Sequence, residues 1–228
     1  MTGADFVIRR AELPVAAGHI EALRAFYDGW GALGDWSGGV SLPAGSGEIA
    51  FVPASERPFH HFALLVPGDR FEAARSWVAA RAPLLAEPGS SETTFVFDDW
   101  DALACYVADP AGNIVELIAH AELCRSGRSG PFHPSEVCAV SEVGLVVDDR
   151  LPALDALAER GIDLWSGWEG PGGLSFVGRK GYTLILVAPG RGWLPTGTPA
   201  ERGAASVLVS VDGGEVPVSA AAGLLTAG

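Results

Sequence analysis

Histidine and cysteine, which supply the nitrogen and sulfur ligands of metal sites, are sparse in this chain. It has five histidines and three cysteines among 228 residues. The cysteines, Cys105, Cys124 and Cys138, form no CxxC pair of the kind that holds zinc, and an odd, sparse set does not indicate a disulfide framework. We expect Cys105 and Cys138 to be small core residues rather than nucleophiles. No glycine-rich segment carries the Lys-Ser/Thr pair of a phosphate loop.

The most informative histidines stand side by side at the start of a predicted strand. Successive side chains of a strand point to opposite faces, so His60 and His61 must separate, and His60 is expected to be a surface or interface residue. Glu116 lies in a second predicted strand. His120 shares the face of Glu116 but lies about 13 Å further along that strand, too far to join one site. His61 and Glu116 could also be a plain hydrogen-bonded pair, and this alternative stays open.

Composition excludes several classes of protein. The net charge is −13, 48% of the residues are hydrophobic and 19% are charged, which is typical of a folded globular chain. Strong acidity, with one lysine in the whole chain, argues against nucleic acid and against anionic membranes as partners. No apolar run reaches the about 18–20 residues of a membrane span. We expect a cytoplasmic, reduced protein that acts on a small molecule.

Three places in the sequence show the same order of elements. Apolar strands at 6–15, 59–66 and 140–147 are each followed by a segment with helical spacing of apolar residues, and then by two or three strands. We divide the chain into a first module at 1–57, a second at 58–123, a Ser/Gly/Pro/Arg-rich linker at 124–137, a third half-module at 138–190, and a C-terminal strand and tail at 191–228.

Two segments of the second module carry a resemblance to a known family. His61–Val66 and the run Tyr106–Leu117, which contains Asp-Pro-Ala-Gly-Asn-Ile-Val-Glu-Leu, resemble the vicinal-oxygen-chelate superfamily. This superfamily includes glyoxalase I, bleomycin- and fosfomycin-resistance proteins, epimerases and extradiol dioxygenases. The resemblance implies an α+β fold of repeated βαβββ modules that form a cupped mixed sheet with helices on the outside. We expect modules one and two to share a cup. The unpaired third module should either pair with its counterpart in a homodimer or pack on the C-terminal strand.

The resemblance also implies a set of ligand positions. Metal-binding members use the first and last strands of each module, and here those strands carry Arg10, Glu48, His61, Glu116, Glu142 and Thr183. A cup of the first two modules would bind Zn, Ni, Mn, Co or Fe through His61, Glu116 and Glu48. Arg10 departs from the pattern because a guanidinium cannot ligate. It either pairs with a carboxylate and abolishes the site, or it holds an anionic substrate.

Three functions follow from this resemblance. The first is a metal-dependent lyase, isomerase or epimerase of a small oxygenated organic substrate, with Glu48 or Glu116 as the base and with Arg10, Trp100 and Tyr106 binding substrate. The second is a metal-free protein that binds a small molecule such as an antibiotic. The third is a ring-cleavage dioxygenase, which is disfavoured because such enzymes need two histidines and one carboxylate, and His61 alone is in place.

Overall fold

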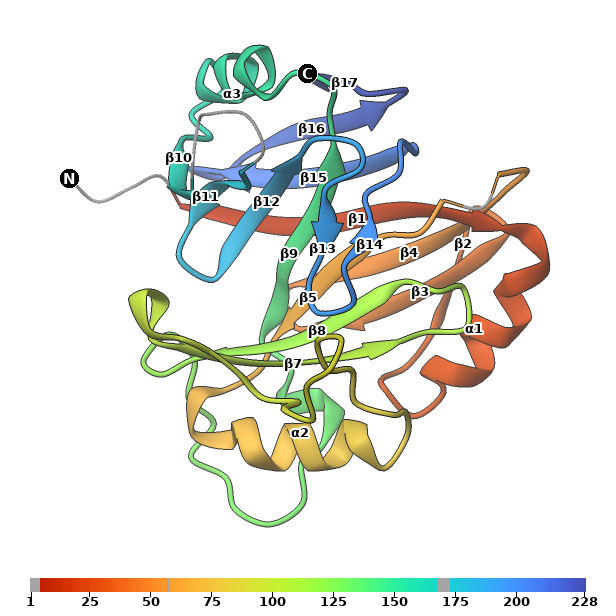
Figure 1. Ribbon diagram of the computed structural model, residues 1–228, viewed down its shortest axis with the longest axis vertical. Coiled ribbons are helices and arrows are strands. Elements are labelled where there is room, and N and C mark those ends of the chain that lie inside the picture. Colours follow the sequence, from red (N-terminus) through yellow and green to blue (C-terminus); the bar gives the residue numbers. More distant parts are fainter. Residues whose placement is uncertain (1–4, 57, 168–172) are drawn as a thin grey trace.

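A computed structural model describes residues 5–56, 58–167 and 173–228 (Figure 1). Three α-helices are described: α1 (Ile20–Tyr27), α2 (Phe71–Ala79) and α3 (Arg150–Ala158). The strands are β1 (Phe6–Ala16), β2 (Gly34–Trp36), β3 (Gly39–Ala44), β4 (Gly47–Ala54), β5 (His61–Leu65), β6 (Phe95–Phe97), β7 (Ala102–Ala108), β8 (Ile114–His120), β9 (Ala139–Val146), β10 (Leu164–Gly167), β11 (Ser175–Arg179), β12 (Tyr182–Val187), β13 (Gly192–Trp193), β14 (Thr198–Pro199), β15 (Ala205–Val211), β16 (Gly214–Ala221) and β17 (Leu224–Ala227).

Two mixed sheets form the body of the protein. A seven-stranded sheet has the order β17-β16-β15-β1-β4-β3-β2, and an eight-stranded sheet has the order β10-β11-β12-β9-β5-β8-β7-β6. One continuous core contains buried side chains of both sheets, among them Leu13 and Phe51 of the first and Phe62 and Val143 of the second. The predicted α+β fold of βαβββ modules in cupped mixed sheets is therefore confirmed.

The predicted pairing of the modules is wrong. The second module pairs with the third, because β5 runs antiparallel beside β9. The first module pairs with the C-terminal strands, because β1 runs antiparallel beside β15. The segment predicted as one strand and a tail thus supplies β15, β16 and β17, which complete the first sheet. The third module is covered within its own chain, so the reason for expecting a homodimer no longer holds.

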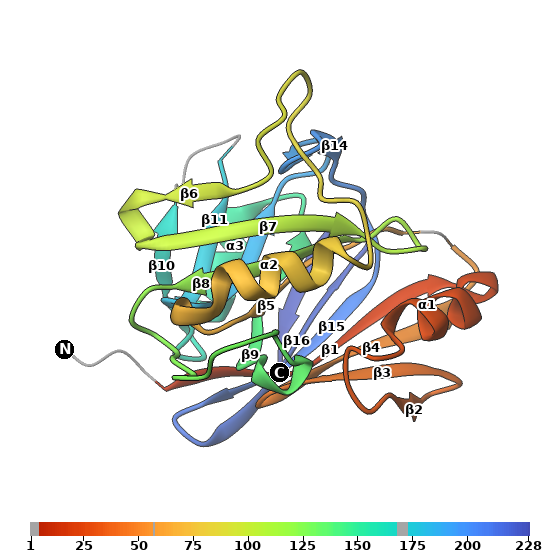
Figure 2. The same ribbon diagram turned by 90° about the horizontal axis from the view of Figure 1, so that it is seen from below.

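The helices lie on the outside of the sheets, as predicted (Figures 1 and 2). Helix α1 packs on β3 and β4, α2 on β7 and β8, and α3 against β11 and β17. In α1 the buried residues Ile20, Leu23 and Tyr27 follow helical spacing, which gives it one apolar face. In the part of the chain that is described, no helix combines the length and apolarity needed to cross a membrane.

The turn Asp109–Asn113 fixes how β8 lies beside β5. The Asp109 carboxylate accepts hydrogen bonds from the backbone N–H groups of Ala111 and Asn113, from the Asn113 side chain and from the Tyr27 hydroxyl. The Asn113 side-chain oxygen in turn accepts a bond from the His60 N–H, at 2.8 Å. These bonds set the register that places His61 opposite Ile114. His60 itself is buried between the sheets, with Nε2 2.8 Å from the Pro14 carbonyl oxygen, rather than on the surface.

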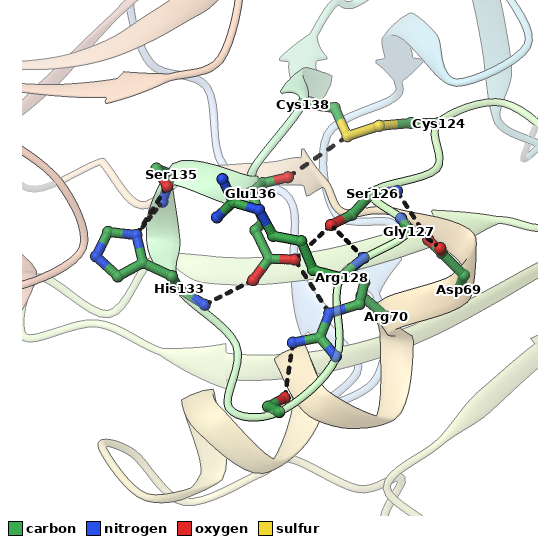
Figure 3. A network of polar contacts seen from close by, with 11 residues as sticks. Asp69, Arg70, Cys124, Ser126, Gly127, Arg128, His133, Ser135, Glu136 and Cys138 are labelled. Carbon is green, nitrogen blue, oxygen red and sulfur yellow. Dashed lines mark hydrogen bonds and ion pairs between the residues drawn. A yellow bond between two sulfur atoms is a disulfide. The ribbon is translucent and has the colours of Figure 1, made fainter.

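The segment predicted as a linker is held to the rest of the protein by a disulfide, an ion pair and hydrogen bonds. Cys124 and Cys138 are bonded, which corrects the expectation of unpaired cysteines and removes the cysteine argument for a reducing compartment (Figure 3). Arg70, at the start of α2, forms a buried ion pair with Glu136 at 3.0 Å. The Asp69 carboxylate accepts bonds from the N–H groups of Ser126 and Gly127.

Counting thiols tests this arrangement. In denaturant without reductant we expect one labelled thiol per chain, Cys105, and three after reduction. In the native protein Cys105 should resist alkylation at pH 8, because burial, the main cause, and nearby Glu116 raise its pKa to about 12. Mass spectrometry after alkylation reads out all three states. Three thiols in unreduced, denatured protein would contradict the disulfide.

Candidate functional site

Three ionisable side chains from different strands meet on one face of the eight-stranded sheet. His61 begins β5, Glu116 lies within β8 and Glu142 within β9. One ligand atom of each lies within 4.8 Å of the other two, and all three residues are buried. His61 Nε2 is 3.3 Å from Glu116 Oε2. One imidazole with two carboxylates is a mixed nitrogen and oxygen donor set, which suits divalent transition metals.

Strand register explains why these side chains meet. Ala63 is paired with Glu116 on one side and with Glu142 on the other, so the two carboxylates flank a small residue on the same face. His61 lies two residues before Ala63 on β5 and therefore points to that face as well. A larger side chain in place of Ala63 would occupy the space between the carboxylates.

Two buried polar atoms near this cluster lack hydrogen-bond partners among the described residues. Within the described ranges, His61 Nδ1 and Thr183 Oγ1 are buried without a hydrogen-bond partner. Thr183 is paired with Glu142, so its hydroxyl shares the face of the cluster. Burial, and then the charge of Glu116, raise the pKa of Glu142 well above its ordinary value. Since no described arginine or lysine forms an ion pair with either carboxylate, a divalent cation fits the cluster.

The cluster forms the polar part of a narrow cavity of about 60 Å³. The other described residues of its walls are aromatic or aliphatic, apart from the cationic Arg191. They are Phe97, Trp100, Tyr106, Leu174, Phe176, Ile185, Arg191, Trp193 and Leu194. Tyr106 is the cross-strand neighbour of Glu116. Burial, and then the charge of Glu116, raise the pKa of Tyr106 well above its ordinary value. Since a single water needs about 10–15 Å³, the cavity holds only a few waters or a small ligand.

The β13–β14 hairpin covers the cavity. It lies across β5 and β9 in Figure 1, and the ring of Trp193 is 5.0 Å from that of His61. Gly144 on β9 makes this approach feasible, because a Cβ atom there would lie 2.6 Å from the Trp193 ring. The hairpin can therefore cover the site only because position 144 of β9 is a glycine.

Gly144→Ala is therefore expected to push Trp193 outward and loosen the hairpin. Backbone amides of the hairpin, such as that of Gly197, which donates to the Trp193 carbonyl, should exchange with deuterium at least about tenfold faster. Gly18→Ala, where a Cβ would meet nothing within 4 Å, is the control and should leave this exchange unchanged. Unaltered protection of the hairpin in Gly144→Ala would show that Trp193 does not rest on Gly144.

The structure assembles some of the predicted site residues and separates others. His61, Glu116, Trp100 and Tyr106 line one cavity. Glu48 and Arg10 do not, because β1 and β4 belong to the other sheet.

Arg10 and Glu48 instead form an ion pair with each other, at 2.6 Å. The Arg10 guanidinium also stacks on Trp36, and the Ser41 hydroxyl donates to Glu48. Burial would raise the pKa of Glu48, but the bonds from Ser41 and Arg10 lower it below its ordinary value. In the first sheet, the charge of Glu48 is thus neutralised by Arg10. Neither the ligand role of Glu48 nor the substrate role of Arg10 is supported.

Sequence reasoning does not identify Glu142, Arg191 or Trp193 as neighbours of His61. The resemblance marks Glu142 as a ligand position of the third module, but the predicted pairing of modules separates it from His61. Arg191 and Trp193 carry no motif, and they reach the cavity through the hairpin between β12 and β15. A lone Arg-Gly-Trp in a Gly/Pro-rich segment offers no periodic signal that would identify it.

Comparisons with known proteins agree with this architecture. No protein-family model matches the sequence, and no curated protein is significantly similar to it. Among solved structures, the V278E mutant of glyoxalase I from Zea mays is 13% identical, covers 98% of this chain and 92% of its own, and has a TM-score of 0.53. A protein assigned as a dioxygenase from Bacillus subtilis subsp. subtilis str. 168 is 15% identical, covers 92% of this chain and 67% of its own, and has a TM-score of 0.50. The chain has the fold of the vicinal-oxygen-chelate superfamily.

Proposed function

We propose that this protein is a metal-dependent enzyme that moves a proton on a small oxygenated organic substrate, as a lyase, isomerase or epimerase. The observation that carries the proposal is the buried cluster of His61, Glu116 and Glu142, which has two carboxylates and no cationic partner among the described residues. Two close buried carboxylates are unfavourable unless one is protonated or a cation lies between them.

The residues of the site have two kinds of role, which are positioning and proton transfer. When bound, the metal would act as a Lewis acid toward a substrate oxygen. The Glu116 carboxylate is oriented by its neighbours, because it lies opposite Tyr106 on the adjoining strand and 3.3 Å from His61 Nε2. Glu142 lines the cavity, and no described residue donates a hydrogen bond to it, so its carboxylate can take up a proton from a substrate carbon. The apolar walls and Trp193 exclude water from this transfer.

Two alternatives are less well supported. A ring-cleavage dioxygenase normally uses two imidazoles, and the described cluster offers one. A metal-free drug-binding protein needs a larger space, since drug-sized ligands occupy pockets of about 300–1,000 Å³. The cavity here is about 60 Å³.

Proton exchange in D₂O tests the proposal without knowledge of the natural substrate. Protein loaded with Zn²⁺, Mn²⁺ or Co²⁺ is incubated with hydroxyacetone or 2-oxobutanoate, and deuterium at the carbon beside the carbonyl is followed by NMR. At a metal concentration that saturates each variant, we expect metal-dependent exchange that falls at least about hundredfold in Glu142→Gln and is unchanged in Glu48→Gln. Oxygen consumption without exchange would instead support the dioxygenase, and exchange that survives in Glu142→Gln would contradict the assignment of the base.

A further inference from the structure

Among the described residues that line the cavity of His61, Glu116 and Glu142, Arg191 is the one arginine or lysine. Its backbone is fixed at the base of the hairpin, because its N–H donates to the Ala188 carbonyl and its own carbonyl accepts from the Ala200 N–H. The position of the side chain is thus tied to the same hairpin that brings Trp193 over His61.

The guanidinium of Arg191 uses little of its hydrogen-bonding capacity within the protein. One nitrogen donates to the Gly192 carbonyl at 2.9 Å, and no carboxylate in the described ranges forms an ion pair with it. Arg10 and Arg70, which are also at least partly buried, are each paired with a glutamate. Partial burial, and then the nearby positive charge of Arg150, lower the pKa of Arg191.

Charge balance indicates what Arg191 binds. The carboxylates of Glu116 and Glu142 together match the charge of a divalent ion, and a neutral imidazole adds none. Within the described ranges, the charge of Arg191 therefore has no balancing anion in the loaded site, and a half-buried guanidinium is stabilised by an anion. A planar carboxylate matches the two parallel N–H groups of one guanidinium, whereas a doubly charged phosphate beside two glutamates would need more cations.

We propose that Arg191 recognises the carboxylate of the substrate, and that the substrate is a small organic acid whose apolar body lies against the aromatic walls of the cavity. This deepens the proposed function, on which it rests for the metal-bound oxygen of the substrate. Carboxylate recognition itself does not require the metal. A flat or branched apolar group would pack against the aromatic rings of Trp100, Phe176 and Trp193, which line the cavity. The ring centroids of Trp100 and Phe176 are 4.6 Å apart.

The test compares lactate with lactamide, two probes of nearly equal size that differ in charge. Their dissociation constants are measured by calorimetry in the full-length protein, both metal-free and loaded with Co²⁺. We expect the wild type to prefer lactate by at least about tenfold in both forms. Arg191→Gln should lose this preference, and Arg191→Lys should keep part of it. Arg160→Gln changes an exposed arginine two residues beyond the end of α3, and this variant should behave as the wild type.

The affinity for Co²⁺ separates this inference from the proposed function. It should change less than about twofold in Arg191→Gln, because Arg191 is not a ligand. A wild type that does not distinguish the two probes, or an Arg191→Gln variant that still prefers lactate, would overturn the role of Arg191. A preference that appears only in Co²⁺-loaded protein and survives in Arg191→Gln would assign the carboxylate to the metal. Failure to bind Co²⁺ would refute the proposed function, while the metal-free measurement would still decide the role of Arg191.

Discussion

Glu142→Gln is expected to lower the affinity for Zn²⁺ or Co²⁺ by at least about hundredfold. The substitution keeps the size of the side chain but removes one of the two charges that face the ion, and loss of a supporting residue alone commonly costs about 10–100-fold. His61→Ala should have an effect of the same order, since it removes the nitrogen ligand of the cluster. Competition with a chromophoric chelator measures each affinity.

Glu48→Gln is the matched control for this experiment. Glu48 is also a partly buried glutamate on a last strand of its module, but it lies in the other sheet and is paired with Arg10. Its substitution should change metal affinity by less than about threefold. Loss of binding in Glu48→Gln with retention in Glu142→Gln would restore the ligand set predicted from sequence and contradict the one assembled by the structure.

The largest expected effect on stability comes from the ion pair beneath the disulfide. Arg70 and Glu136 are 6% and 3% exposed, and the Glu136 carboxylate also accepts bonds from the Ser126 hydroxyl and the His133 N–H (Figure 3). Arg70→Met leaves this carboxylate buried without its cation, which should lower the free energy of unfolding by about 3–5 kcal/mol. Urea denaturation without reductant, so that the disulfide stays intact, provides the measurement.

Two further variants show whether burial causes this effect. The double variant Arg70→Met, Glu136→Gln removes both charges and should recover part of the loss. Glu122→Gln breaks the exposed pair with Arg125 and should change stability by no more than about 0.5 kcal/mol. Equal losses in Arg70→Met and Glu122→Gln would show that the Arg70 pair is no more than a surface interaction.

Local patterns predicted single elements well. The apolar strands expected at 6–15, 59–66 and 140–147 correspond to β1, β5 and β9. These segments are rich in apolar residues, and the turns that end them lie in the adjoining residues. The period of a strand, however, does not say which other strand it will pair with, so the pairing of β5 with β9 could not be predicted from it.

Long-range contacts account for what the sequence concealed. Cys124 and Cys138 are brought together because Gly68 donates to the Cys124 carbonyl and Cys138 donates to the Leu65 carbonyl, both at 2.8 Å. Neither hydrogen bond can be predicted from the spacing of the cysteines. The residues of the site are also brought together by long-range contacts. His61 and Glu116 could be found from a motif within one module, whereas Glu142 depended on the module that lies beside it.

The central claim is that His61, Glu116 and Glu142 bind one divalent metal. Anomalous diffraction from crystals of the protein grown with Co²⁺ tests it most directly. The structure predicts one peak at about 2.0–2.2 Å from a His61 nitrogen and from oxygens of Glu116 and Glu142. A peak elsewhere in the chain, or no peak among these three side chains at saturating Co²⁺, would contradict the claim.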